Sequence, residues 1–380
     1  MNESISTATY LDRITRARAS MARTNVDVLL VSVGSDLPYL TGYEAMPLER
    51  LTMLVVPRHG EATMVIPRLE APRVVERPGV FELVRWDETE DPVALVAALA
   101  GKPDRPGAPG APGRVAVGDT MWARFLVDLL PLWPATRYVR STTVMNDLRM
   151  CKDAAEIAAL QAAGAAADRV AAQLHAGEIA LVGRTEAAVS AEIGARLIAE
   201  GHDIVNFAIV AAGENAASPH HHASDRVIRT GELVLFDFGG TMNGYCSDIT
   251  RCVSLGDPPA DVADAYAVLF AAQAAGMKAG VVGAACEDVD RASRKVIADA
   301  GYGEYFIHRT GHGIGMEAHE DPYMVEGNTL PIAPGHAFSV EPGIYISGRW
   351  GMRLEDCAVA TVDGPLALNA ADHSLVVLDV

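Results

Sequence analysis

Residues 233–253, LVLFDFGGTMNGYCSDITRCV, place two aspartates on either side of a short turn. The residues before Asp237 are apolar and β-prone, Asn243-Gly244 is a strong hairpin signal, and residues 245–253 are typical of a returning strand. A hairpin folded here brings Asp237 and Asp248 close together across two antiparallel strands. Two ionised carboxylates about 4 Å apart repel by roughly 4 kcal/mol at an effective dielectric of ~20, so they require a proton or a cation between them.

A second group of candidate residues follows in HRTGHGIGMEAHE, residues 308–320, where three glycines surround His312. These glycines let the backbone approach whatever the histidine binds. Glu341 in SVEPG and Glu355 in RLED lie on two further strand-like runs, and ISGRWG between them predicts a second hairpin. Two hairpins therefore each contribute two carboxylates, and a glycine-flanked histidine stands between them in the sequence.

This set of side chains indicates a metal centre. Four buried carboxylates without compensation repel one another prohibitively, whereas two divalent cations balance their charge. Mostly oxygen ligands with one neutral imidazole favour Mn²⁺, with Co²⁺, Zn²⁺ or Fe²⁺ as alternatives. Cys246 and Cys252 are disfavoured as ligands because the surrounding oxygen ligands suit harder metals.

The composition restricts the class of protein. A chain of 380 residues, half of them hydrophobic, suggests two domains with large cores. The net charge of −18 argues against nucleic-acid or anionic-membrane partners. The sequence shows no signal-peptide core and no apolar run of about 18 residues, and its five cysteines are scattered without a CxxC pair. We therefore expect a cytoplasmic protein with reduced thiols.

The first part of the chain, residues 1–148, has the pattern of a small α/β domain with a structural or substrate-covering role. Residues 101–114 are rich in Pro and Gly and predict a flexible surface loop within it. The short β-branched runs and the helical patterns fall as follows: strands at 27–33, 51–57, 61–67 and 115–119, and helices at 68–76 and 91–100.

Residues 149–380 begin with long alanine-rich helical patterns. Asp153 with Glu156 predicts a capping box that opens a helix to about His175, and Thr185 caps a second helix that ends near Gly201. The scheme recurs with helices at 261–277 and 287–300, followed by strand-rich sequence. Two helices followed by a hairpin with paired acids, twice over, predict an internally duplicated domain.

These motifs together resemble the Xaa-Pro dipeptidase and aminopeptidase P family, whose pita-bread fold is shared with methionine aminopeptidase and creatinase. The overall run is most similar to the actinobacterial dipeptidase branch. The resemblance implies an α+β fold with two domains, a creatinase-like N-terminal domain at 1–148 and a duplicated catalytic domain at 149–380, in which helices cover a curved antiparallel sheet. The motifs that carry it are Asp237, Asp248-Ile-Thr-Arg251, GHGIG around His312, SVEPG with Glu341 and RLED with Glu355.

The resemblance also implies a role for each ligand. Asp237 chelates one metal, His312 and Glu341 bind mainly the other, and Asp248 and Glu355 bridge both. A hydroxide held between two such ions forms near neutral pH and attacks a peptide carbonyl, while the metals stabilise the oxyanion.

Further roles follow from the same resemblance. His220, in SPHHH, contacts the substrate, as does His308, and His319 stabilises the tetrahedral intermediate or assists proton transfer. Arg353 orients the site and meets a substrate carboxylate. Simpler interpretations remain open: Arg353 as an ion-pair partner of nearby carboxylates, and His221 and His222 as surface neighbours of His220.

Four further residues are expected to act without touching the substrate. Thr250 and Arg251 are expected to support Asp248, and His336 and His373 are expected to be structural.

We expect a dinuclear-metal exopeptidase that hydrolyses the bond between an N-terminal residue and proline, most simply in Xaa-Pro dipeptides. The resemblance supplies the proline specificity and suggests a homodimer. The alternatives are aminopeptidase P activity on longer peptides, a small-molecule hydrolase or lyase on the same fold, and a binding protein without catalysis. The sequence fixes neither the preferred first residue nor the native metal.

Overall fold

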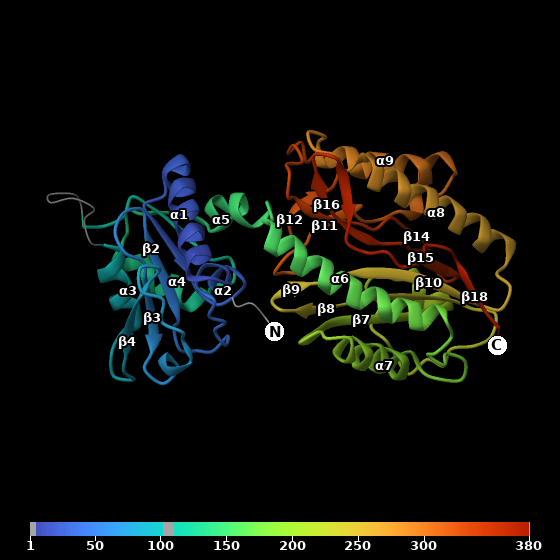
Figure 1. Cartoon of the computed structure of the whole chain (residues 1–380), viewed down its shortest axis with the longest axis horizontal. Helices are drawn as coiled ribbons and strands as arrows, with labels where there is room; N and C mark the ends of the chain where they lie inside the picture. Colours follow the sequence, from blue (N-terminus) through green and yellow to red (C-terminus); the bar gives the residue numbers. More distant parts are fainter. Residues whose placement is uncertain (1–4, 102–109, 380) are drawn as a thin grey trace. The chain divides into compact units, whose positions relative to one another are not determined.

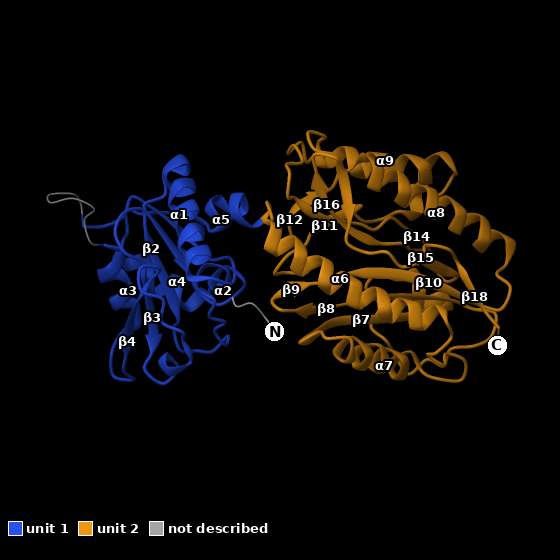
Figure 2. Ribbon diagram, viewed as in Figure 1, with its two compact units in different colours: residues 1–149 blue, residues 150–380 orange. Residues whose placement is uncertain are grey.

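The computed structural model describes residues 5–101 and 110–379. The chain divides into two compact units, Met1–Arg149 and Met150–Val380 (Figure 2). This division lies one residue from the domain boundary expected from the sequence. The predicted loop at 101–114 falls largely outside the described residues. In the described ranges, no helix is both long enough and apolar enough to cross a bilayer.

The first unit is built on a mixed six-stranded sheet with the order β4-β3-β2-β1-β5-β6. The pairs β1–β2 and β2–β3 are antiparallel, whereas β3–β4, β1–β5 and β5–β6 are parallel. Its elements are α1 (Thr7–Thr24), β1 (Val28–Val31), α2 (Asp36–Thr41), β2 (Met53–Pro57), β3 (Thr63–Pro67), η1 (Ala71–Arg73), β4 (Glu82–Trp86), α3 (Pro92–Ala100), β5 (Arg114–Val117), α4 (Ala123–Leu129), η2 (Leu130–Leu132), β6 (Arg137–Arg140) and α5 (Thr142–Arg149).

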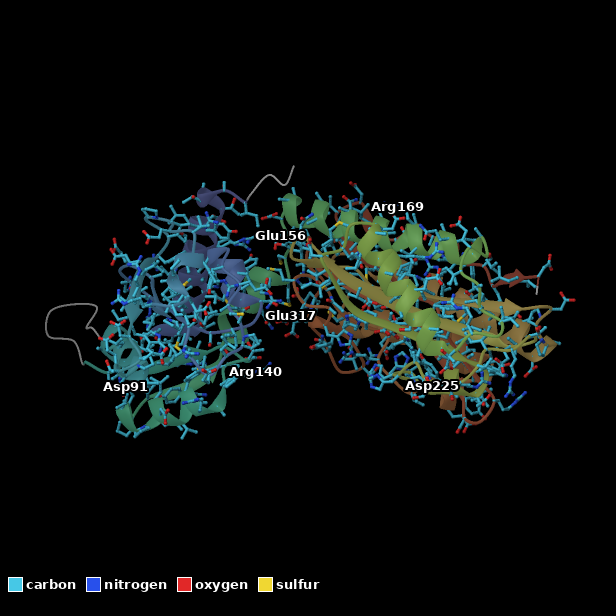
Figure 3. All side chains as sticks on the ribbon, turned by 90° about the horizontal axis from the view of Figure 1, so that it is seen from below. Asp91, Arg140, Glu156, Arg169, Asp225 and Glu317 are labelled. Carbon is cyan, nitrogen blue, oxygen red and sulfur yellow. The ribbon has the colours of Figure 1, made fainter. Side chains whose placement is uncertain are left out.

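One predicted helix in this unit was wrong. The pattern at 68–76 forms only the short 3₁₀ turn η1, because Val74 already has an extended backbone and the β-branched pair that begins with it disfavours a longer helix. The helix predicted at 91–100 is confirmed as α3, whose N-cap Asp91 accepts hydrogen bonds from two backbone amides and is labelled in Figure 3.

The second unit contains four long helices and two main sheets. One sheet has the order β18-β10-β8-β7 with β9 on β8, the other has the order β12-β11-β13-β16-β17, and β14 pairs with β15. The helices are α6 (Ala154–His175), α7 (Glu186–Ala199), α8 (Ala260–Ala279) and α9 (Cys286–Asp299), with 3₁₀ turns η3 (Gly213–Ala217) and η4 (Gly303–Tyr305). The strands are β7 (Ile204–Ala212), β8 (Leu233–Met242), β9 (Tyr245–Cys246), β10 (Ile249–Leu255), β11 (Gly311–Gly313), β12 (Glu320–Met324), β13 (Ala337–Val340), β14 (Gly343–Ile346), β15 (Trp350–Arg353), β16 (Asp356–Thr361), β17 (Gly364–Ala367) and β18 (Val376–Leu378).

The aspartate hairpin is confirmed as β8 and β10. Asp237 lies opposite Thr250 in the antiparallel register, and Asp248 directly precedes β10. The turn between the strands carries Asn243 with φ 53° and Gly244 with φ 82°. Two successive positive φ angles suit the tight turn that matches strand twist, which explains the Asn-Gly pair.

The duplication predicted from the order of elements is visible in the structure. The helices α6 and α7 pack with β7, β8 and β10 in one core, and α8 and α9 pack with the later strands (Figure 1). Isolated bridges form at equivalent points before α7 and α9, from Thr185 to Val227 and from Ala285 to Pro331. The predicted capping box of Asp153 and Glu156 at the start of α6 is also confirmed.

The two sheets meet where the candidate ligands lie. An isolated antiparallel bridge joins Thr250 of β10 to Glu355, which stands between β15 and β16. The fold therefore brings residues about a hundred positions apart into one layer.

We predict that Gly239→Ala weakens this arrangement, because a Cβ at Gly239 would overlap the carbonyl of Ser247 across the hairpin. The strands must separate, so we expect at least about 2 kcal/mol of destabilisation and weaker metal binding, measured by chemical unfolding and metal titration. Gly194→Ala in α7 is the matched control, since its new Cβ makes ordinary contacts at 3.6 Å and alanine favours helix. Equal stability of the two variants would contradict this account.

Candidate metal centre

Five side chains converge where the two sheets of the second unit meet. The groups His312–Glu341–Glu355 and Asp237–Asp248–Glu355 each bring their ligand atoms within 4.8 Å of one another. Four of the five residues are buried, and Glu341 is partly buried. The two groups share Glu355, and together they contain all five residues predicted as ligands.

His312 is oriented as a metal ligand. Its Nδ1 donates to the carbonyl of Gly313 at 3.0 Å, which leaves the lone pair of Nε2 facing the carboxylates. This Nε2 lies 3.3 Å from Glu341 Oε1, 3.7 Å from Asp248 Oδ2 and 4.0 Å from Glu355 Oε1. Burial, together with the neighbouring His319, lowers the pKa of His312 to about 3, so the ring is neutral.

The carboxylates repel one another strongly in the absence of a cation. Burial and then the charge of Glu355 raise the pKa of Asp248 well above its usual value, and burial raises the pKa of Glu341 to about 7. Buried Asp237 Oδ1 and Glu355 Oε1 have no hydrogen-bond partner. Open carboxylate oxygens beside a neutral imidazole nitrogen fit divalent cations.

Arg353 pairs with a carboxylate of the protein itself. Its guanidinium is 2 % exposed and forms an ion pair with Asp237. It also donates to Tyr345 Oη at 2.8 Å, to Thr250 Oγ1 at 3.1 Å and to the carbonyl of Pro219 at 3.3 Å. These contacts favour the interpretation in which Arg353 is an ion-pair partner of nearby carboxylates.

Thr250 and Arg251, which were expected to support Asp248, contact the segment at Glu355 instead. Thr250 Oγ1 donates to Glu355 Oε2 at 2.7 Å. Arg251, fully buried, donates to the Glu355 carbonyl at 2.7 Å and pairs with Asp356 at the same distance. The expectation that these two residues support Asp248 was thus wrong, because the bridge between Thr250 and Glu355 places them beside the Glu355 segment.

A pocket of about 730 Å³ opens onto the centre. All nine predicted site residues line it, among them His220, which is exposed, and His319, whose ring centroid is 3.9 Å from that of His312. The lining consists of Phe207, Ile209, Ser218, Pro219, His220, Asp237, Asp248, Ile307, His308, Arg309, His312, His319, Glu341, Arg353 and Glu355.

Two histidines have contacts that the sequence did not reveal. His308 donates through Nδ1 to the carbonyl of Arg309 at 2.7 Å, and its Nε2 bonds to Tyr345 Oη at 2.9 Å, so both nitrogens have protein partners. The prediction that His221 is a surface neighbour was wrong. Its Nε2 lies 2.8 Å from Oε2 of the fully buried Glu186.

Arg309 is a pocket residue that the sequence analysis missed. In the part of the chain that the structure describes, its guanidinium stacks on the ring of Tyr323, with 4.3 Å from Cζ to the ring centroid, and pairs with no carboxylate. Its position directly after His308, in the HRTGHG run, was the available signal.

Comparison with known proteins agrees with this geometry. The model of metallopeptidase family M24 matches residues 158–362, and the creatinase/prolidase N-terminal domain matches residues 13–151. The chain belongs to metallopeptidase family M24. The family resemblance and the two-domain α+β fold predicted from the sequence are therefore confirmed, and the protein is a metallopeptidase of the dipeptidase type.

This M24 peptidase is similar over nearly its whole length to named relatives. It is 45% identical to a probable dipeptidase PepE of Mycobacterium tuberculosis over 98% of this chain and 97% of the relative. It is 35% identical to an Xaa-Pro dipeptidase of Lactobacillus helveticus over 94% and 96%. The crystal structure of dipeptidase PepE from Mycobacterium ulcerans matches with a TM-score of 0.92 at 44% identity, covering 99% of this chain and 100% of that chain.

We predict that metal removal destabilises the M24 peptidase more at pH 8 than at pH 5.5. The raised pKa of Glu341 means that its contribution to metal-free stability is present below about pH 4.5 and is lost as the pH rises through about 7. At about 1.4 kcal/mol per pKa unit, this one group costs roughly 3 kcal/mol at high pH.

Thermal unfolding with excess Mn²⁺ or with a chelator, at both pH values, measures the effect. We expect the chelator to lower the Tm by roughly 10 °C at pH 8 and by clearly less at pH 5.5. An equal decrease at both pH values would show that the cost of ionising the buried Glu341 does not govern metal-free stability.

Proposed function

We propose that this M24 peptidase is a dinuclear-metal exopeptidase that hydrolyses Xaa-Pro dipeptides, with Mn²⁺ as the preferred metal. The observation that carries the proposal is the cluster of four carboxylates and one neutral histidine at the base of a pocket of about 730 Å³. The Xaa-Pro dipeptidase named among its relatives supports the substrate. The five residues of the cluster would hold the ions.

The cations, when bound, lower the pKa of a water molecule and polarise the scissile carbonyl. The chain's own residues then orient the substrate and move protons. His319 stands beside His312, and burial lowers its pKa, so the ring is neutral at neutral pH and has a free nitrogen for a hydrogen bond to the substrate or for proton transfer. His220 lines the same pocket and suits contact with the substrate. Arg353 holds Asp237 in place through its ion pair.

We assign recognition of the substrate carboxylate to Arg309 in preference to Arg353. Arg353 already forms an ion pair with Asp237 and donates hydrogen bonds to Tyr345 and Thr250. Arg309, in contrast, lies in the pocket without a carboxylate partner among the described residues. The free carboxylate of a dipeptide belongs to its second residue, directly after the scissile bond, and therefore lies in the same pocket. A cation at that position favours a dipeptide over a longer peptide.

We further propose that the enzyme is cytoplasmic and forms a homodimer. All five cysteines are free, as expected for a reducing compartment. The dimer rests on the family resemblance, and its test is the mass in solution by light scattering.

The first experiment compares release of proline from Ala-Pro with cleavage of Ala-Pro-Ala, using protein stripped of metal and resupplied with Mn²⁺. We expect metal-dependent cleavage of the dipeptide and little cleavage of the tripeptide. Preference for the tripeptide would indicate aminopeptidase P activity. Cleavage of neither, with metal bound, would indicate a small-molecule substrate.

Asp248→Ala is the control variant for this assay. It removes a carboxylate shared between the proposed ions, so we expect loss of metal binding and at least a 10³-fold loss of turnover. Wild-type turnover in this variant would overturn the proposed centre.

We predict that Arg309→Ala raises the KM for Ala-Pro by roughly 10-fold to 100-fold, because a charge-assisted contact to the carboxylate is lost. The same variant should change the KM for the amide Ala-Pro-NH₂ little, since that substrate has no carboxylate. Equal effects on both substrates would assign Arg309 another role.

A further inference from the structure

A buried acid lies beneath the loop that carries His220. Glu186 is the first residue of α7, and its side chain is fully buried. It lies outside the metal cluster and does not line the pocket. A carboxylate in such a position is costly unless its oxygens are fully hydrogen-bonded.

Among the described residues, the hydrogen bonds of the Glu186 side chain all go to one segment. Its Oε1 accepts from the amide of Ala212 at 2.9 Å and from Asn215 Nδ2 at 3.0 Å. Its Oε2 accepts from His221 Nε2 at 2.8 Å and from Ser224 Oγ at 2.6 Å. Burial raises the pKa of this carboxyl group, but these donors outweigh burial and leave the pKa below its usual value. Glu186 thus ties residues 212–224 to the start of α7.

His220 lies between two anchored neighbours in this segment. On one side, the carbonyl of Pro219 accepts from Arg353 at 3.3 Å. On the other side, His221 is held by Glu186. The turn itself is closed by the amide of His221, which donates to the carbonyl of Ser218 at 3.1 Å. His220 is exposed, and it is the backbone on both sides that fixes where its ring can reach.

We propose that Glu186 and His221 are positioning residues, which hold the loop so that His220 reaches the substrate in the pocket. This inference rests on the proposed function, because it takes His220 as a substrate contact. Neither residue touches the reacting atoms. Their effect is preorganisation: a displacement of about 1 Å in a catalytic group can cost about 10²-fold in rate.

The test uses His221, since removal of the buried Glu186 endangers folding. In the Mn²⁺-loaded enzyme we expect His221→Ala to lower kcat/KM for Ala-Pro by roughly 10-fold to 100-fold, with metal content unchanged. His221→Gln keeps a donor near the position of Nε2 and should restore most of the activity. His222→Ala, at the exposed neighbouring histidine, is the matched control and should behave as wild type.

A double variant separates positioning from general destabilisation. If His221 acts through His220, His221→Ala should have little further effect on kcat/KM in the His220→Ala background. Additive losses would overturn the inference. Wild-type activity of His220→Ala alone would instead refute the proposed role of His220, so the two failures are distinguishable.

A second measurement does not depend on activity. Hydrogen exchange of peptides that cover residues 213–224 should be faster in His221→Ala than in wild type, while His222→Ala should match wild type. Unchanged exchange in His221→Ala would show that Glu186 and His221 do not hold this loop.

Discussion

The constraint on which the catalytic unit depends is the cost of burying four carboxylates that also repel one another, beside one imidazole. Asp248, Glu341 and Glu355 lie 3.3–4.0 Å from His312 Nε2, and Asp237 adjoins Asp248 and Glu355, in an interior where charges are poorly screened. The surrounding structure offsets only part of this cost: Arg353 neutralises Asp237, and Thr250 donates to Glu355. Asp237 Oδ1 and Glu355 Oε1 have no hydrogen-bond partner in the described part of the chain and fit a bound cation. Metal binding therefore supports both the stability of the unit and its activity.

In both repeats, a buried carboxylate on the second helix holds a loop of the pocket. Just as Glu186 on α7 ties down residues 212–224, the fully buried Asp290 on α9 accepts from the amide of Thr310 at 2.9 Å. Its partner Arg294 donates to the carbonyls of Phe306 at 2.9 Å and His308 at 2.7 Å. In each half, the second helix therefore fixes one wall of the pocket through a buried carboxylate, although the sequences of the two loops differ.

The sequence predicted best what depends on local chemistry. The capping box at Asp153 and the Asn243-Gly244 turn follow from the needs of nearby backbone groups, and the ligand motifs carry their flanking residues with them. The ion-pair and hydrogen-bond partners of long charged side chains were harder to predict. Arg353 meets Asp237 across 116 residues, and nothing near either residue signals that pairing.

The bond of His221 to Glu186 was missed for the same reason, and the helix predicted at 68–76 failed because Val74 adopts an extended backbone. In the first case a distant contact decides the role of the residue, and in the second a local steric preference outweighs the apparent periodicity.

The distribution of ligands over the two repeats has a consequence for the chain as a whole. Asp237 and Asp248 belong to the first repeat, whereas His312, Glu341 and Glu355 belong to the second. Neither half holds a complete set, and the link between them at residues 256–259 joins β10 to α8. A chain cut there would hold its halves together through their shared apolar core and the pairing of β10 with β18, yet the ligand set would be complete only once they associate, so activity of the cut protein would report that association.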